Sequence, residues 1–238
     1  MSKIVSCLCI TYKRTSFLEK SIEYFKSQNY SEKELIVVFQ DNDDETNKFI
    51  SENDYKKYEY DHLKSNAKKI SYCKNDIIFI RVSKDLTLGE KRNLSIDFSN
   101  GEYVCIWDDD DFHHPERITK QLNFLQYCKK SSCVLSNIMI YNEPLNKLYY
   151  GPLRPDGWEG TLICLKNKIG RYLHLNKKED TPVVQELYKS KELSVIECPE
   201  LYIYFLHSHN TSAGDHFNEM IYYSLECDFN EYTSYEFN

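Results

Sequence analysis

Short apolar runs alternate with amphipathic stretches along the first half of the chain. Four of these runs are continuous, which predicts strands buried on both faces of a sheet. They span residues 4–10, 34–39, 77–82 and 102–107. After the first run, apolar residues recur at helical spacing at Leu18, Ile22 and Phe25, so a helix is expected there. Ser16 followed by Glu19 predicts a capping box at the start of this helix.

Two further helices are expected in this half. Residues 88–101 read as a loop, a helix and an Asn100-Gly101 stop signal. Pro115 fits the first turn of the next helix, which would turn residues 118, 122 and 125 inward. Residues 53–74, rich in Lys, Tyr and Asn, predict only an irregular or weakly helical insertion. This alternation of strand and helix indicates an α/β fold with a mainly parallel central sheet flanked by helices on both faces.

The second half of the chain is less regular. The strands expected there span residues 133–142, 147–151, 160–165 and a last segment that ends at His207. The first two of these would form a hairpin around Glu143-Pro144. Thr181 can cap a helix that has Pro182 in its first turn. Because no repeat, linker or domain break is evident, we expect a single domain.

Composition excludes several classes of function. The chain has 238 residues and a formal net charge of −7, which argues against general electrostatic binding to nucleic acid. The nine cysteines lack metal-site spacing, and Cys7 and Cys9 would share one face of a strand. Reduced, mostly buried thiols and a cytoplasmic location are therefore expected. With no signal peptide evident and no apolar run near the ~20 residues that cross a bilayer, membrane contact would be at most peripheral.

Four consecutive aspartates, Asp108–Asp111, follow the strand predicted at residues 102–107. The loops after the first two strands, residues 11–15 and 40–46, should lie at the same carboxyl edge of the sheet, where such sheets bind ligands. Crowded carboxylates raise one another's pKa and favour a cation. Their hard oxygen atoms suit Mg²⁺ or Mn²⁺, which complete their shells with phosphate oxygens. A divalent metal that holds a diphosphate is thus expected, and the alternative is an exposed acidic turn.

Five segments, taken in order, resemble a known family. They are VSCLCITYKR, LGEKRN, IWDDDD, KKEDTPVV and LHSHNTS, which begin at residues 5, 88, 106, 177 and 206. The chain resembles an inverting, DxD-containing family 2 glycosyltransferase of GT-A fold, and the resemblance covers most of its length. It implies one Rossmann-like domain over residues 1–227, with a nucleotide-binding half at about 1–125, an acceptor half at about 126–227 and a tail at 228–238.

The resemblance also assigns donor-site roles. The residues implied to line the nucleotide site are Thr11, Tyr12, Arg14, Lys91, Arg92, Asp108 and Asp109, with Asn93 nearby. Asp41 or a neighbour would reach the uracil or ribose, although Phe39 and Gln40 stand where the family usually has adjacent aspartates. The implied ligands of a Mn²⁺ or Mg²⁺ ion are Asp108, Asp110, Asp111 and His207.

On the acceptor side, the resemblance makes Asp180 the general base, with Glu179 as the second candidate. A carboxylate before a helix start stays ionised beside the helix dipole, and simple helix capping is the alternative role. Trp158 would stack on the acceptor sugar or serve as a core aromatic. His207 could instead be a hydrogen-bonded core histidine. His113 and His114 could be metal ligands or part of a surface loop.

The expected function is metal-dependent, inverting transfer of a sugar, of hexosyltransferase type. The donor would be a nucleotide-sugar, a UDP-sugar first of all, and the acceptor a hydroxyl of a glycan, glycolipid or glycoprotein. One alternative is a catalytically silent relative that binds sugar nucleotide or glycan. Another is a nucleotidyltransferase, which would need a Gly-rich, basic nucleotide loop in place of TYKRT. The absence of a Walker-type segment disfavours ATP hydrolysis of the P-loop kind.

Overall fold

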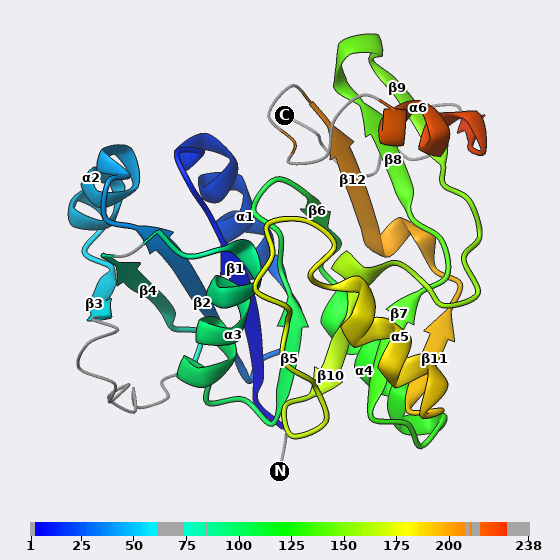
Figure 1. Cartoon of the computed structure of the whole chain (residues 1–238), viewed down its shortest axis with the longest axis horizontal. Helices are drawn as coiled ribbons and strands as arrows, with labels where there is room; N and C mark the ends of the chain where they lie inside the picture. Colours follow the sequence, from blue (N-terminus) through cyan, green and yellow to red (C-terminus); the bar gives the residue numbers. More distant parts are fainter. Residues whose placement is uncertain (1–2, 61–73, 84, 208–209, 211–214, 228–238) are drawn as a thin grey trace.

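The computed structural model describes residues 3–60, 74–83, 85–207, 210 and 215–227, which form two sheets and their covering helices (Figure 1). The strands of the larger sheet are β1 (Val5–Ile10), β2 (Lys33–Gln40), β3 (Lys56–Tyr60), β4 (Ile77–Val82), β5 (Tyr103–Ile106), β7 (Ser132–Leu135), β10 (Ile163–Leu165) and β11 (Leu193–Ile196). Those of the smaller sheet are β6 (Phe112–His113), β8 (Met139–Asn142), β9 (Lys147–Tyr150), β12 (Tyr202–Leu206) and β13 (Leu225–Cys227). The helices are α1 (Thr15–Ser27), α2 (Asp44–Glu52), α3 (Leu88–Phe98), α4 (Arg117–Tyr127), α5 (Thr181–Lys189) and α6 (Asp215–Tyr222).

The larger sheet has the order β11-β7-β10-β5-β1-β2-β4-β3. Its strands are parallel except β10, which runs antiparallel between β5 and β7. This confirms the predicted α/β architecture with a mainly parallel sheet. None of the helices that the structure describes has both the length and the apolarity needed to cross a bilayer.

Helices cover both faces of the larger sheet, which explains why its central strands are apolar throughout. On β1, Cys7 and Cys9 face one core together with Leu18 of α1 and Ile118 of α4. Leu8 and its neighbours on the opposite face pack with side chains of α3 and α5. Five of the eight cysteines among the described residues are buried. The expectation that the thiols are mostly buried is confirmed for the described part of the chain, and their reduced state stays a prediction.

Three helix starts differ from the sequence-based expectation. The capping box predicted at Ser16 is wrong, because α1 already begins at Thr15 and its N-cap residue, Arg14, makes no side-chain cap. The helix predicted to hold Pro115 in its first turn begins two residues later, with Glu116 as N-cap. Thr181 is the first residue of α5 rather than its cap, since the Asp180 side chain accepts a hydrogen bond from the Thr181 N–H.

Strand assignments in irregular regions also needed correction. The predicted insertion at 53–74 contains strand β3, while its residues 61–73 lie outside the described part of the chain, as does the predicted tail at 228–238. The hairpin is confirmed for β8 and β9, but residues 132–135 form β7 in the other sheet. The strand that ends before His207 is not the last one, because β13 follows it.

The two sheets meet at the segment that holds the four aspartates. β5 belongs to the larger sheet, and β6, six residues further on, pairs with β12 in the smaller sheet. Below this crossing, the buried Arg117 guanidinium donates to the carbonyl oxygens of Ile106 and Gly160 and contacts His113 Nδ1. The backbone of the aspartate segment is therefore held from both sheets and from α4.

Candidate active site

Three loops converge at the carboxyl edge of the larger sheet, as the alternation of strands and helices predicted. The backbone N–H of Lys13, after β1, donates to Asp43 Oδ2 at 2.6 Å. Asp43 follows β2 and also accepts from the N–H of Thr46, so it caps α2. Arg14 reaches the aspartates after β5. Residues far apart in sequence thus line one site.

Arg14 is the cation that faces the aspartate cluster. Its guanidinium donates to Asp110 Oδ2 and to Asp109 Oδ1, both at 2.6 Å. Burial raises the pKa of Asp109 to about 8, and the charge of Asp110 adds to this rise although Arg14 opposes it. Asp109 Oδ2 is buried and has no hydrogen-bond partner within the described structure. Arg14 and Arg92, which pairs with Asp108, are two guanidinium groups facing four carboxyl groups, which leaves the cluster suited to a further cation.

The four aspartates differ in what their carboxylates contact. Burial would raise the pKa of Asp110, but hydrogen bonding to His207 and the charge of Arg14 together lower it. His207 Nε2 lies 3.4 Å from Asp110 Oδ2. Asp111 is turned away, because its two oxygens accept from the Tyr202 hydroxyl and the Phe205 N–H. Asp111 therefore anchors β12, a contact that competes with its predicted share in a metal.

The residues present fit a divalent metal through their chemistry. Asp110 and His207 bring a carboxylate oxygen and an imidazole nitrogen to one point, and both are donors to Mn²⁺. Among the described residues no group of three or more His, Cys, Asp or Glu side chains is arranged to hold an ion by itself. Mg²⁺ and similar ions bind through one or two carboxylates plus substrate phosphates, so two protein donors suffice when a diphosphate is bound.

Arg92 connects the aspartates to the predicted catalytic base. Its Nη2 donates to Asp108 Oδ1 at 3.1 Å, and its Nε donates to Glu179 Oε1 at 2.9 Å. Its Nη1 is buried without a partner in the described structure. The family resemblance predicts Arg92 near the ribose or phosphates, whereas in the structure two of its three nitrogens donate to carboxylates 71 residues apart in the chain. Asp108 and the Glu179-Asp180 pair are thereby brought to one place.

Asp180 caps the start of α5, and its carboxyl group has a raised pKa. Its Oδ1 accepts from the Thr181 N–H at 2.9 Å, so the helix-cap role is confirmed. Burial raises the pKa of Asp180 to about 6; Arg92 acts in the opposite direction, and Glu179 and Glu159 add to the rise. Glu159 accepts from the Thr181 hydroxyl at 3.2 Å and from Arg154. A carboxyl group with a pKa near 6 is well suited to accept a proton close to neutral pH.

Three further residues predicted to belong to the site are Lys91, Trp158 and Thr11. Lys91 Nζ lies 5.8 Å from the ring centroid of the exposed Tyr12, and burial lowers the pKa of Lys91. Trp158 is partly buried: its indole N–H donates to the Pro152 carbonyl and Arg154 lies over its ring. Thr11 is buried, with its hydroxyl unpartnered among the described atoms.

The loop after β2 makes a different contact from the one expected. Asp41 uses its backbone N–H to bind the Val82 carbonyl, and no described hydrogen bond involves its carboxylate. Its neighbour Asp43 is the buried residue that contacts the loop after β1, through the Lys13 N–H. Sequence reasoning missed Asp43, although the Asp-x-x-Thr spacing to Thr46 is a helix-cap signal.

His113 is a core residue and not a metal ligand. It stacks on Trp107 with ring centroids 3.8 Å apart, and Nε2 bonds the Asp108 carbonyl. Burial and the adjacent Arg117 lower the pKa of His113 well below the usual value. His114 accepts from the Glu116 N–H through Nδ1. Both histidines thus stabilise the turn after the aspartates. Glu159, which contacts Thr181, and Arg117, which contacts His113, also support the site, and the sequence did not predict either contact.

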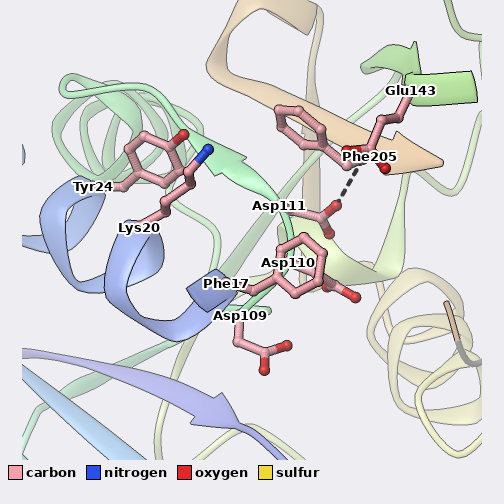
Figure 2. Close-up of a pocket in the computed structure, with 8 residues that line it drawn as sticks. All are labelled: Phe17, Lys20, Tyr24, Asp109, Asp110, Asp111, Glu143 and Phe205. Carbon is pink, nitrogen blue, oxygen red and sulfur yellow. Dashed lines mark hydrogen bonds between the residues drawn. The ribbon is translucent and has the colours of Figure 1, made fainter. Parts of the chain in front are cut away.

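A hollow lies beside the aspartates, between α1 and the smaller sheet (Figure 2). It is lined by Phe17, Lys20, Tyr24, Asp109, Asp110, Asp111, Glu143 and Phe205. Three aromatic side chains contribute to its walls, and Phe17 also stacks on His207 at 4.6 Å between ring centroids. The aspartate segment therefore borders a hollow on the α1 side, while Asp108 contacts Arg92 from α3.

Comparisons with known proteins agree with this architecture. The family model described as Glycosyl transferase family 2 matches residues 6–159. The uncharacterized glycosyltransferase MJ1057 of Methanocaldococcus jannaschii is 26% identical over 146 residues, which cover 61% of this chain and 45% of that protein. The chain thus spans less than half of the length of that relative.

Solved structures share the fold at low sequence identity. S. aureus TarS 1–349 in complex with UDP has a TM-score of 0.64 and 16% identity, over 85% of this chain and 60% of that one. The mannosyltransferase PcManGT from Pyrobaculum calidifontis, in complex with GDP-Man and Mn2+, has a TM-score of 0.61 and 11% identity, over 88% and 59%. This likeness confirms the predicted GT-A fold. Because the family model matches well over half of the chain, the protein belongs to glycosyl transferase family 2.

Proposed function

We propose that the protein is a metal-dependent glycosyltransferase that moves a sugar from a nucleotide-sugar to an acceptor hydroxyl with inversion. One observation carries the proposal. Arg92 contacts both Asp108 of the aspartate cluster and Glu179, next to Asp180. A carboxylate able to take a proton thus lies near carboxylates able to bind a metal diphosphate, which are the two components that inverting transfer requires.

The donor proposed is a UDP-sugar. The similar TarS structures are complexes with UDP and with UDP-GlcNAc, and PcManGT is a complex with GDP-Man and Mn2+. Nucleotide-sugars are common to these neighbours, while the base and the sugar differ. The proposed acceptor is a hydroxyl of a glycan, free or carried by lipid or protein.

In the proposed mechanism, Asp180 takes the proton of the acceptor hydroxyl as the oxygen attacks the anomeric carbon. The bond to the diphosphate breaks on the opposite face, so the configuration inverts. Asp110 and His207 would hold the metal, which stabilises charge on the leaving diphosphate. Lys91 and Tyr12 would contact the nucleotide from the α3 and β1 sides. Arg92 would hold the Glu179 side chain through its ion pair and so position the adjoining Asp180.

The second candidate is a silent relative that binds a nucleotide-sugar without transferring it. The raised pKa of Asp180, about 6, favours the enzyme because a plain surface cap would gain nothing from burial of its carboxyl group. A nucleotidyltransferase is disfavoured by the membership in glycosyl transferase family 2.

Calorimetric titration of UDP with and without Mn²⁺ tests the metal. Mn²⁺ should tighten binding to the wild type, and Asp110→Asn should remove about 1–3 kcal/mol of that gain, the range for losing a charged interaction. Asp54→Asn is a matched control, because Asp54 is exposed in a turn after α2. Equal UDP affinity with and without Mn²⁺ in the wild type would rule out the proposed diphosphate site.

A further inference from the structure

One segment on the acceptor side departs from the acidic character of the chain. Residues 166–178 contain five Lys and Arg residues and no Asp or Glu, whereas the whole chain has a net charge of −7. In Figure 1 this yellow segment leads from β10 past α3 to α5. Its end is two residues before Asp180. The local charge therefore differs from the rest of the molecule next to the proposed base.

Three of these five cationic side chains already contact other residues of the chain. Lys166 donates to the Ser99 carbonyl, Lys168 pairs with Glu192 and Arg171 pairs with Asp97. None of the ion pairs found among the described residues involves Lys177 or Lys178, and both lysines are exposed. The free cations are thus concentrated at the end of the segment nearest to Asp180.

Two leucines are exposed beside these lysines. Leu173 and Leu175 have 49% and 46% of their surface exposed, and the one residue between them, His174, is polar and also exposed. Two exposed apolar side chains and two exposed lysines thus lie within six consecutive residues. We call residues 173–178 the leucine–lysine loop.

The backbone of the leucine–lysine loop is fixed at both ends and in the middle. Asn93 makes two hydrogen bonds to the backbone of Tyr172, each 2.9 Å long. Glu179 is held by Arg92. Between them, the Gly89 N–H donates to the Leu175 carbonyl at 3.0 Å and the Leu88 N–H to Asn176 Oδ1.

Gly89 is required for this arrangement. A Cβ atom at this position would overlap the carbonyl oxygen of Leu173, so only glycine lets the loop lie on the first turn of α3. The loop is therefore ordered independently of any partner, and its leucines are exposed because the backbone is bound to α3. Such preorganisation lowers the entropic cost of binding another surface.

We propose that the leucine–lysine loop docks the protein on the surface of an anionic lipid bilayer. Lys177 and Lys178 complement the negative charge of the headgroups. Leu173 and Leu175 can enter the boundary between headgroups and acyl chains, where amphipathic segments bind. An anionic polymer such as a nucleic acid would use the cations but would gain nothing from the leucines, which is why a bilayer is favoured.

Docking of this kind would bring the bilayer to the acceptor side of the site. The Asp180 carboxylate would then face hydroxyl groups carried on lipid, a consequence that rests on the proposed function. The docking itself needs neither donor nor metal. A binding assay on vesicles therefore tests it independently of glycosyl transfer, and Asp180→Asn should bind vesicles as the wild type does.

Co-sedimentation of the full chain with vesicles is the direct test. The vesicles are phosphatidylcholine alone and phosphatidylcholine with about one-third phosphatidylglycerol. The wild type should bind the anionic vesicles and bind the neutral ones much more weakly. Lys177→Gln/Lys178→Gln should weaken this binding by about tenfold to thirtyfold, as expected for two cations at an anionic surface. Leu173→Gln/Leu175→Gln should weaken it at least about fivefold.

Matched controls use exposed residues of the same types elsewhere. Leu145→Gln/Leu225→Gln, in the β8–β9 connection and in β13, and Lys48→Gln, in α2, should leave binding unchanged. Absence of wild-type binding to anionic vesicles would overturn the proposal. Loss of binding in the lysine variant with full binding in the leucine variant would also overturn it, and would identify the loop as a site for anionic polymers.

Discussion

The Arg92–Glu179 contact offers a sharp test of how the site is held together. Both side chains are almost inaccessible, with 7% and 3% of their surface exposed, and Nε lies 2.9 Å from Oε1. Arg92→Met would leave Glu179 buried without its cation. Breaking a buried ion pair on one side costs about 3–5 kcal/mol. The free energy of unfolding, which is about 5–15 kcal/mol for a typical domain, should fall by that amount.

A double variant separates the contribution of the Arg92–Glu179 charge pair from the loss of packing around the Arg92 side chain. Arg92→Met/Glu179→Gln removes both charges while conserving much of the volume, so its loss should be smaller than that of Arg92→Met alone by about 1–3 kcal/mol. Arg171→Met is the control, because Arg171 pairs with Asp97 at 2.6 Å but its side chain is 61% exposed. Exposed pairs contribute about 0–1 kcal/mol, so this variant should remain close to the wild type.

Urea unfolding followed by tryptophan fluorescence measures five proteins under one condition: the wild type, Arg92→Met, Glu179→Gln, the double variant and Arg171→Met. The stabilising role of the Arg92–Glu179 ion pair would be refuted if Arg92→Met lowered the free energy of unfolding no more than Arg171→Met does. It would also be refuted if the double variant were as unstable as the sum of its two single variants, since no coupling would then exist between the groups.

Two further predictions concern catalysis. Asp180→Asn should lower the rate of transfer by about 10²–10⁴-fold while UDP affinity is kept. In the wild type, kcat/KM should rise with pH around pH 6, because the carboxyl group of Asp180 has a pKa of about 6 and must lose its proton to act as base. Full transfer by a folded Asp180→Asn protein, or a kcat/KM that does not change with pH, would contradict this role. Gly89→Ala should displace the Leu173 backbone and the nearby Glu179, so the rate of transfer should fall while UDP binding changes little. Gly170→Ala is the control, because a Cβ atom at Gly170 meets open space. Equal activity of the two alanine variants would contradict the packing argument.

The central strands could be predicted because each is a continuous apolar run enclosed by helices on both sides. β3 could not, since most of its side chains are exposed at the edge of the sheet and its sequence, KKYEY, has no apolar run. β10 is three residues long and antiparallel, and a segment this short carries no information about its direction. The start of α1 was misplaced because its N-cap residue, Arg14, makes no side-chain cap and instead binds Asp109 and Asp110.

The meeting of the loops could likewise be predicted, because carboxyl ends of parallel strands share one edge. Which charges pair there could not. Arg14 binds two of the four aspartates, and Arg92 binds a third together with Glu179. These choices depend on side-chain distances that no spacing in the sequence encodes. The role of Asp111 in anchoring β12 was missed for the same reason, since its partners are more than 90 residues away.

The measurement that most directly tests the central claim is a donor screen. Purified protein is incubated with Mn²⁺, a mixture of glycan acceptors and a panel of UDP-, GDP- and dTDP-sugars, and release of nucleoside diphosphate is recorded. We expect release from a UDP-sugar that stops on addition of EDTA and returns with excess Mn²⁺. Wild-type protein that binds UDP yet releases nucleoside diphosphate from no donor, or releases it equally well in EDTA, would contradict the account.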